Sequence, residues 1–299
     1  ALLREQHADL ASLTLVDAGE GWDNRLFRLG ERLAVRMPRR AASVVLMEQE
    51  QRWLPELSAR LPLPIPVPIR IGRPGCGYPW RWSVVPWLPG ESALFVRWHR
   101  RLMAVDLGRF LRRLHQPAPE DAPLNPWRGI PLRYRDHAFR KHLQQLEGLV
   151  EQSNALSVWD RALSASPWPG PPLWIHGDLH PGNLLVTRGR LSAVIDFGDL
   201  AAGDPATDLG VMWMMLPSQV RPAFLSSVRG PFNPCDEHTQ MRARGWAVAL
   251  GVSWLSRSVN DDAMRALAAR GGTPGISEAA TCVSEGLSAR FAPPKARRR

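Results

Sequence analysis

The chain has 299 residues, of which 44% are hydrophobic and 22% charged, and it carries a formal net charge of +10. This balance is ordinary for a globular protein. The longest apolar run, Trp246–Leu255, is about half the ~20 residues that a membrane-spanning helix needs. The basic residues are scattered and mostly arginine, whereas nucleic-acid binding usually shows a clustered basic stripe with aromatic side chains. We therefore expect neither a membrane protein nor a nucleic-acid binder.

The cysteines also bound the class of protein. They are odd in number and far apart, so they form no metal-type pair and no disulfide framework; they are Cys76, Cys235 and Cys282. The first ten residues carry charged side chains and lack the uninterrupted apolar stretch of a secretory signal. Together these observations predict a cytoplasmic protein.

Short apolar runs dominate the first 90 residues. Helical spacing of apolar residues predicts one helix there, at 42–57. The alternating prolines of 61–79 favour an extended connector. Strand periodicity, with a hairpin turn at Gly30–Glu31, predicts four strands, at 12–18, 25–30, 32–38 and 80–88.

After Pro89–Gly90 the pattern changes from strand to helix. Apolar residues at helical spacing predict helices at 100–115, 139–150 and 239–258. Beyond Gly271 the pattern dissolves into small residues and proline. We therefore expect an α/β fold of the α+β type with three parts: a small sheet-plus-helix N-lobe (1–89), a larger, mainly helical C-lobe (90–272) and a disordered basic tail (273–299).

A dense polar cluster, HGDLHPGNLLV, follows a short apolar run in the second half of the chain. Asp178 is followed five residues later by Asn183 and eighteen residues later by Asp196. The apolar runs 184–186 and 191–195, with Gly189 between them, predict a hairpin that returns Asp196 to the side of Asn183. The resulting group of two carboxylates and an amide suits Mg²⁺, with one carboxylate free to act as a base.

This spacing resembles the kinase template, and the chain is similar to the aminoglycoside phosphotransferase family of small-molecule kinases. HGDLHPGNLLV, VIDFGDLAAGDPATDLG and GWDNRLFRLGERLAVRMP carry the resemblance, which covers roughly residues 8–267. It implies a two-lobed, protein-kinase-like fold. It also implies that Asp178 accepts the proton of an acceptor hydroxyl, while Asn183 and Asp196 hold Mg²⁺ on ATP or GTP, the phosphoryl donors.

The N-lobe is expected to bind the nucleotide. Protein kinases use a strand lysine that pairs with a helix glutamate, but no lysine precedes Lys141 here. Arg36, on the third predicted strand, takes that place, and Glu50 is its predicted partner. A guanidinium can hold phosphate through two hydrogen bonds. The alternative is that Arg36 is an ordinary surface arginine.

Two further segments are predicted to contact the nucleotide. The turn that contains Asp23 and Asn24 lies where backbone amides would cover the phosphates, although the same turn could be a simple hairpin connection. In VPWLPG, the prolines lack an N–H. By the family register, Leu88 donates a hydrogen bond to the base and the Pro86 carbonyl accepts one, a pattern that suits both adenine and guanine.

Four polar residues near the cluster are expected to be structural. The resemblance implies that His176 packs behind the loop, that His180 flanks the site, and that Asp208 accepts backbone hydrogen bonds from the catalytic loop. Asp204, which precedes Pro205, suits a turn before a helix. His176, Asp178 and His180 also permit a metallohydrolase site, which we keep as an alternative.

We predict an aminoglycoside-type antibiotic as the acceptor, and at least one of two late acidic pairs should bind its ammonium groups. The pairs are Asp236–Glu237 and Asp261–Asp262, of which the second also suits a surface turn after a helix. The alternatives are a macrolide, another hydroxylated metabolite such as a sugar or choline, or a nucleotide-binding module without catalysis. The sequence leaves the oligomeric state open.

Overall fold

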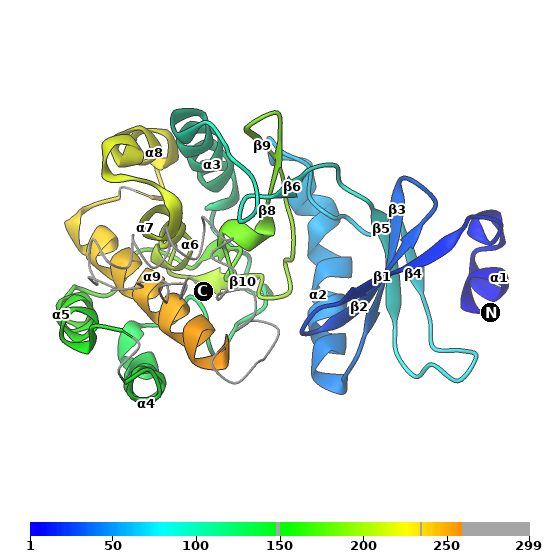
Figure 1. Ribbon diagram of the computed structural model, residues 1–299, viewed down its shortest axis with the longest axis horizontal. Coiled ribbons are helices and arrows are strands. Elements are labelled where there is room, and N and C mark those ends of the chain that lie inside the picture. Colours follow the sequence, from blue (N-terminus) through cyan, green and yellow to red (C-terminus); the bar gives the residue numbers. More distant parts are fainter. Residues whose placement is uncertain (148–149, 234, 259–299) are drawn as a thin grey trace, which may run out of the picture.

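The computed structural model describes residues 1–147, 150–233 and 235–258. It has two lobes, one built around a sheet and one mainly helical (Figure 1). The predicted tail, 273–299, lies outside the described residues. The elements of the N-lobe are α1 (Leu2–Gln6), η1 (Ala8–Leu10), β1 (Leu15–Glu20), β2 (Asn24–Leu29), β3 (Leu33–Pro38), α2 (Ala41–Ser58), β4 (Arg70–Gly72) and β5 (Trp82–Pro86).

The N-lobe sheet is antiparallel throughout, in the order β1-β2-β3-β5-β4. The four predicted strands and the turn at Gly30 are confirmed. Within the proline-rich connector the structure adds β4, a three-residue strand at the edge of the sheet. Every residue of the opposite edge strand, β1, is exposed, so the apolar side chains of this lobe come mainly from the central strands.

Helix α2 joins the two lobes. It lies between the N-lobe sheet and the C-lobe (Figure 1) and matches the predicted helix at 42–57. Its second half buries Trp53, Leu54 and Leu57 in the large apolar core of the C-lobe. The Trp53 ring packs edge-on against Trp174, with ring centroids 5.0 Å apart. Although α2 precedes the C-lobe in sequence, half of it is therefore part of the C-lobe core.

In the C-lobe, α3 packs between α8 and the short strand β9, and α9 packs against α4, α5 and α6 (Figure 1). The elements of the C-lobe are β6 (Glu91–Ser92), α3 (Arg100–Leu114), η2 (Leu132–Arg135), α4 (Asp136–Gln144), α5 (Gln152–Leu163), β7 (Leu173–Ile175), η3 (Pro181–Asn183), β8 (Leu184–Thr187), β9 (Arg190–Val194), β10 (Ala201–Gly203), α6 (Ala206–Leu209), α7 (Val211–Met215), η4 (Ser218–Val220), α8 (Arg221–Val228) and α9 (Glu237–Ser258).

The sequence misplaced one helix and missed several, of which α5 is the longest. The helix predicted at 139–150 begins earlier and ends at Gln144. Helix α5 was not predicted, because Ser and Asn residues lie between its apolar positions. Its buried residues nevertheless follow helical spacing, at Ala155, Trp159 and Ala162. No helix among the described residues is both long enough and apolar enough to cross a membrane.

Candidate active site

The polar cluster lies on a loop between two short strands of the C-lobe. β7 pairs with β10, and the predicted hairpin forms from β8 and β9. Between them the chain turns sharply at Gly177, whose φ is +85°, a conformation that L side chains rarely adopt. A Cβ atom there would lie 2.3 Å from the carbonyl oxygen of Asp199. Only glycine therefore lets the loop pass this close to the chain that follows Asp196.

Asp208 fixes the backbone of this loop from the protein interior. Its side chain is fully buried and accepts hydrogen bonds from the N–H groups of His176 and Gly177, at 2.8 and 2.9 Å. His115 Nε2 lies 3.1 Å from the same carboxylate. Because buried N–H groups are costly to leave unpaired, this carboxylate fixes the backbone just before Asp178. The structure thus gives Asp208 the contacts that the resemblance implied.

Asp178 projects from the loop with its carboxylate partly exposed. Arg128 Nη2 lies 3.0 Å from Oδ1, and His180 Nε2 lies 3.6 Å from Oδ2. Burial alone would raise the pKa of Asp178, but His180 and Arg128 outweigh it and hold that pKa below its ordinary value. Asp178 is therefore a carboxylate at neutral pH, the form that can accept a proton.

Asn183 and Asp196 lie close together at the end of the hairpin, as the spacing predicts. The Ile195 N–H donates to the Asn183 carbonyl at 3.0 Å, and Asn183 Nδ2 donates to the Asp178 carbonyl at 2.9 Å. This second bond occupies the amide nitrogen of Asn183 and leaves its oxygen available as a ligand. Asp196 has an exposed carboxylate and a positive φ of +64°, a conformation that strains a residue with a side chain.

These oxygen donors fit Mg²⁺, which commonly takes one or two protein oxygens together with phosphates and water. A histidine-based zinc site has no comparable support. His176 Nε2 lies 3.0 Å from the Ile195 carbonyl, its Nδ1 accepts from the Asp178 N–H, and His180 Nδ1 accepts from Gly182 N–H. Within the described ranges, no three His, Cys, Asp or Glu side chains are grouped so as to hold a metal.

The predicted pair in the N-lobe is formed. Arg36 Nη1 lies 2.5 Å from Glu50 Oε2, and both side chains are buried. Arg36 Nη2 also lies 3.8 Å from Asp196 Oδ1, so this arginine faces the candidate metal site. Burial alone would lower the pKa of Arg36, but Glu50 and Asp196 raise it above its ordinary value. Arg36 is thus a fixed cation between the lobes rather than a surface arginine.

The predicted hinge has the expected backbone pattern. Trp87 donates its N–H to the Arg32 carbonyl at 2.7 Å. Leu33 and Pro86 consequently form a non-hydrogen-bonded pair, so the Pro86 carbonyl points away from β3. Among the described residues, the Leu88 N–H has no backbone hydrogen-bond partner. A donor and an acceptor therefore lie two residues apart, as the contact with a nucleotide base requires.

The turn before β2 is fastened to the start of α2. Asp23 Oδ1 accepts from Arg40 Nη2 and Ser43 Oγ, both at 2.7 Å. Asn24 begins β2, and its carbonyl accepts from the Gly21 N–H at 2.9 Å. The side chain of Asp23 is thus used to hold the turn in place, which leaves backbone amides as its means of contacting a phosphate.

Of the predicted acceptor residues, Asp236 and Glu237 are not brought to Asp178. Asp236 accepts from the Thr239 N–H at the start of α9, and Glu237 follows it. Trp254, eighteen residues further along α9, contacts His180, with ring centroids 4.5 Å apart. At 1.5 Å per residue, the helix separates the two ends by ~27 Å. The other pair, Asp261–Asp262, lies outside the described residues.

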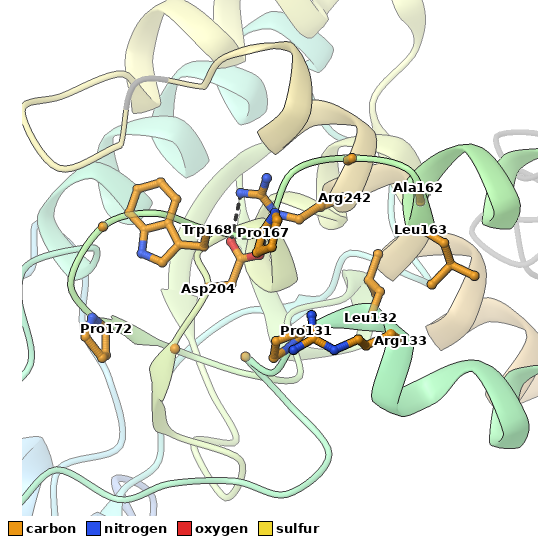
Figure 2. Close-up of a pocket in the computed structure, with 14 residues that line it drawn as sticks. Pro131, Leu132, Arg133, Ala162, Leu163, Pro167, Trp168, Pro172, Asp204 and Arg242 are labelled. Atoms are coloured by element: carbon orange, nitrogen blue, oxygen red, sulfur yellow. Dashed lines mark hydrogen bonds and ion pairs between the residues drawn. The ribbon is translucent and has the colours of Figure 1, made fainter.

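A separate pocket of about 310 Å³ lies in the C-lobe, beside α5 and α9 (Figure 2). Asp204 lines this pocket, where it pairs with buried Arg242 at 2.7 Å. It also accepts a hydrogen bond from the Ala206 N–H at 2.9 Å. The Arg242 guanidinium also donates to the Ser166 carbonyl and Thr239 Oγ1. Both charges are satisfied within the protein, which supports the predicted structural role of Asp204.

Three residues at the site were not predicted. Arg128 bridges Asp178 and Asp199, with Nη2 3.0 and 3.2 Å from their carboxylates. Asn125 Nδ2 donates to Asp199 Oδ1 at 2.7 Å. Asp199 stands inside the VIDFGD motif and could have been considered. Arg128 and Asn125 lie in a connector, where nothing in the local sequence indicates that they reach a loop about 50 residues later.

Comparisons with known proteins agree with this geometry. An aminoglycoside 3'-phosphotransferase from Escherichia coli is 31% identical over 120 residues, which is 39% of this chain and 44% of that enzyme. The uncharacterized protein YcbJ of Bacillus subtilis (strain 168) is 34% identical over 71 residues, or 21% of this chain and 23% of that protein. The chain thus spans less than half the length of these curated relatives.

Solved structures share the fold over almost the whole chain. The GDP complex of a mutant aminoglycoside 2'-phosphotransferase-IIIa has a TM-score of 0.67 and 19% identity and covers 95% of both chains. The macrolide 2'-phosphotransferase MphH from Brachybacterium faecium has a TM-score of 0.59 and 22% identity and covers 98% of both. A model of the APH phosphotransferase enzyme family matches residues 14–241. The chain therefore belongs to the APH phosphotransferase enzyme family.

Proposed function

We propose that this protein transfers the γ-phosphoryl group of ATP or GTP to a hydroxyl group of a small molecule. The observation that carries the proposal is the meeting of three groups between the lobes. Asp178 presents an ionised carboxylate, Asn183 and Asp196 present oxygens, and Arg36 lies 3.8 Å from Asp196. A base, a metal site and a phosphate-binding cation are the parts that phosphoryl transfer requires.

Each residue has a separate part in the proposed reaction. Asp178 accepts the proton of the acceptor hydroxyl as its oxygen attacks the γ-phosphorus. Arg36, held by Glu50, binds the α- and β-phosphates through its guanidinium. Asn183 and Asp196 hold Mg²⁺, which would neutralise part of the triphosphate charge when bound. Pro86 and Leu88 bind the base through backbone groups, a contact that ATP and GTP can both make.

The acceptor that we propose is an aminoglycoside. The support is the similarity to the E. coli aminoglycoside 3'-phosphotransferase, which includes 120 residues at 31% identity. A macrolide is the second candidate, because a macrolide phosphotransferase shares the fold over 98% of the chain. The two solved structures described above are each less than 25% identical to this chain, so neither decides between the two candidate acceptors.

A panel of acceptors tests this function. Purified protein is incubated with Mg²⁺, with ATP or GTP, and with one candidate acceptor at a time: an aminoglycoside, a macrolide, a sugar or choline. The mass of each acceptor is then measured by mass spectrometry. We expect the mass of one phosphoryl group on an aminoglycoside and none with Asp178→Asn protein. Phosphorylation of a macrolide alone would show that the acceptor is a macrolide. Nucleotide binding without any phosphorylated acceptor would support a nucleotide-binding module without catalysis.

The acidic pair Asp261–Asp262 remains our proposed site for acceptor ammonium groups. The support is the contact between Trp254 and His180, which brings the last part of α9 beside the catalytic loop. Changing both residues to Asn should raise the KM for an aminoglycoside about tenfold at low salt and less at high salt. The matched control is Asp236→Asn with Glu237→Gln, which we expect to leave that KM unchanged.

A further inference from the structure

The connector between α3 and η2 forms a fixed arm, residues 123–129, beside the catalytic loop. Ala202 N–H donates to the Pro123 carbonyl at 2.8 Å, and Asp204 N–H donates to the Gly129 carbonyl at 2.9 Å. The arm lies so close to β10 that a Cβ atom on Gly203 would be 2.6 Å from the Gly129 Cα. Both ends of the arm are therefore held against the strand that pairs with β7.

The arm turns its polar side chains toward the catalytic carboxylates. Asn125 Oδ1 accepts from Trp127 N–H at 2.8 Å, which closes a tight turn, and Asn125 Nδ2 donates to Asp199 at 2.7 Å. Arg128 reaches Asp199 and Asp178 with the same nitrogen, Nη2. Asp199 therefore holds the arm in place, and Arg128 is fixed beside Oδ1 of Asp178.

Arg128 has N–H groups without hydrogen-bond partners among the described residues. A guanidinium has five N–H groups, and only those on Nη2 have partners within the described residues. The Nε atom is buried without a hydrogen-bond partner among them. An arginine that served only to tie the arm to the loop would be expected to form hydrogen bonds through more than one of its nitrogen atoms. Because Nε is enclosed by protein, the unpaired Nη1 group is the donor that remains for an anionic partner beside Asp178.

A cation this close to Asp178 weakens the attraction of that carboxylate for a proton. In phosphoryl transfer this cost is small, because the transition state is loose and its negative charge lies mainly on the oxygens of the transferring group. A fixed donor aimed at those oxygens lowers the barrier, since it stabilises the charge without reorganisation. The position of Arg128 is unfavourable for a pure base and favourable for phosphoryl transfer.

We propose that Arg128 is a further catalytic residue, which binds the γ-phosphoryl group through its unpaired N–H donors. The inference rests on the proposed function. In the step, the acceptor oxygen bonds to the γ-phosphorus as the bond to the β,γ-bridging oxygen breaks. That oxygen keeps the electron pair and leaves with the nucleoside diphosphate, while the acceptor proton passes to Asp178.

The test compares nucleotide affinities in protein that carries Asp178→Asn, so that no effect can pass through the base. Dissociation constants for ADP and for a non-hydrolysable ATP analogue are measured by calorimetry with Mg²⁺. Arg128→Gln should weaken analogue binding at least tenfold and change ADP binding less than threefold. Arg128→Lys, which keeps the charge, should lose less, and it replaces the Gln variant if that protein does not fold.

Asp199→Asn separates this role from a purely structural one. Both variants break the same ion pair, but Asp199→Asn removes a negative charge and leaves the guanidinium, so the preference for the analogue over ADP should stay or rise. Arg133→Gln, an exposed change four residues after Gly129, is the matched control and should alter neither affinity. Equal losses in the Arg128 and Asp199 variants, or an unchanged preference in Arg128→Gln, overturn the proposal. Wild-type protein that binds neither nucleotide overturns the proposed function first.

Discussion

The two lobes are stabilised in different ways. The fully buried apolar cluster of the N-lobe consists of Leu29, Val35, Trp82 and Val84, whereas the C-lobe cluster runs through α3, α5, α8 and α9 and includes half of α2. The N-lobe has a smaller apolar cluster and also contains buried or partly buried polar contacts, such as Arg36–Glu50 and Asp23–Ser43. Apolar burial is the larger source of stability in most domains, so the C-lobe should be the more rigid part.

This difference suits the division of labour that we propose. Asp178, Asn183 and Asp208 lie on the rigid lobe, where small displacements of a base or a metal ligand would be costly. In the proposed function the N-lobe would bind the nucleotide through backbone groups and one arginine, contacts that tolerate movement as substrate enters and product leaves. Five single substitutions and one double variant test the comparison, and they are ordered by the expected size of their effects.

The largest effect should come from Asp178→Asn in the rigid lobe. Loss of the base should lower kcat about 10³-fold, which is ~4 kcal/mol, while the affinity for Mg-nucleotide changes less than threefold. Calorimetry and steady-state kinetics on the same protein provide both numbers. Asp196→Ala should abolish Mg-dependent nucleotide binding and activity together. If Asp178→Asn keeps kcat within tenfold, Asp178 is not the base.

Arg36→Met should unfold the N-lobe locally. It leaves the carboxylate of Glu50 buried without a counter-charge, a loss of ~3–5 kcal/mol for a broken buried pair. Hydrogen exchange should accelerate in β2, β3 and β5 and stay slow in α3 and α9. The double variant Arg36→Met, Glu50→Gln should recover much of this loss, because no unpaired charge remains. Uniform acceleration across both lobes would contradict the comparison.

Asp208→Asn should loosen the C-lobe itself. An amide can accept only part of what the carboxylate accepts from His176, Gly177 and His115. We expect a loss of ~3 kcal/mol in the free energy of unfolding, because hydrogen bonds to a buried charge are lost. Urea unfolding followed by tryptophan fluorescence measures it. A change of less than about 1 kcal/mol, the size of one ordinary hydrogen bond, would show that the loop holds its shape without this anchor.

The smallest effect concerns an N-lobe hydrogen bond, from Tyr78 Oη to the Pro38 carbonyl. Burial raises the pKa of Tyr78 from 10.0 to about 12. Between these values the unfolded chain has released the proton that the folded chain keeps, so the free energy of unfolding falls as pH rises. Tyr78→Phe should flatten this fall. Wild-type and variant curves with the same slope above a pH of about 10, the ordinary pKa of tyrosine, would contradict the assignment.

Much of the fold and site could be predicted because the signals are local. The strands of the N-lobe are short apolar runs bounded by turn residues, and one hairpin returns Asp196 to the side of Asn183. The role of Arg36 was predicted because no lysine precedes Lys141 in the sequence. In each case a short stretch of chain contains both the pattern and the geometry that it produces.

The rest depends on contacts between distant segments. The three-residue strands β7 and β10 are too short to show a period, and α5 carries polar residues between its apolar ones. Arg128 meets Asp178 only because the connector folds against β10. The distance from Asp236 to the catalytic loop depends on the direction of α9, which no local pattern specifies.

Helix α2 has a consequence for recombining this chain with its relatives. A crossover after Pro89 would separate Trp53, Leu54 and Leu57 from the core in which they are buried, even though the linker there looks like a natural boundary. A chimera that exchanges the whole N-lobe would inherit a foreign helix surface inside the host core. Exchange should succeed when α2 stays with its original C-lobe and only the strands around it are replaced.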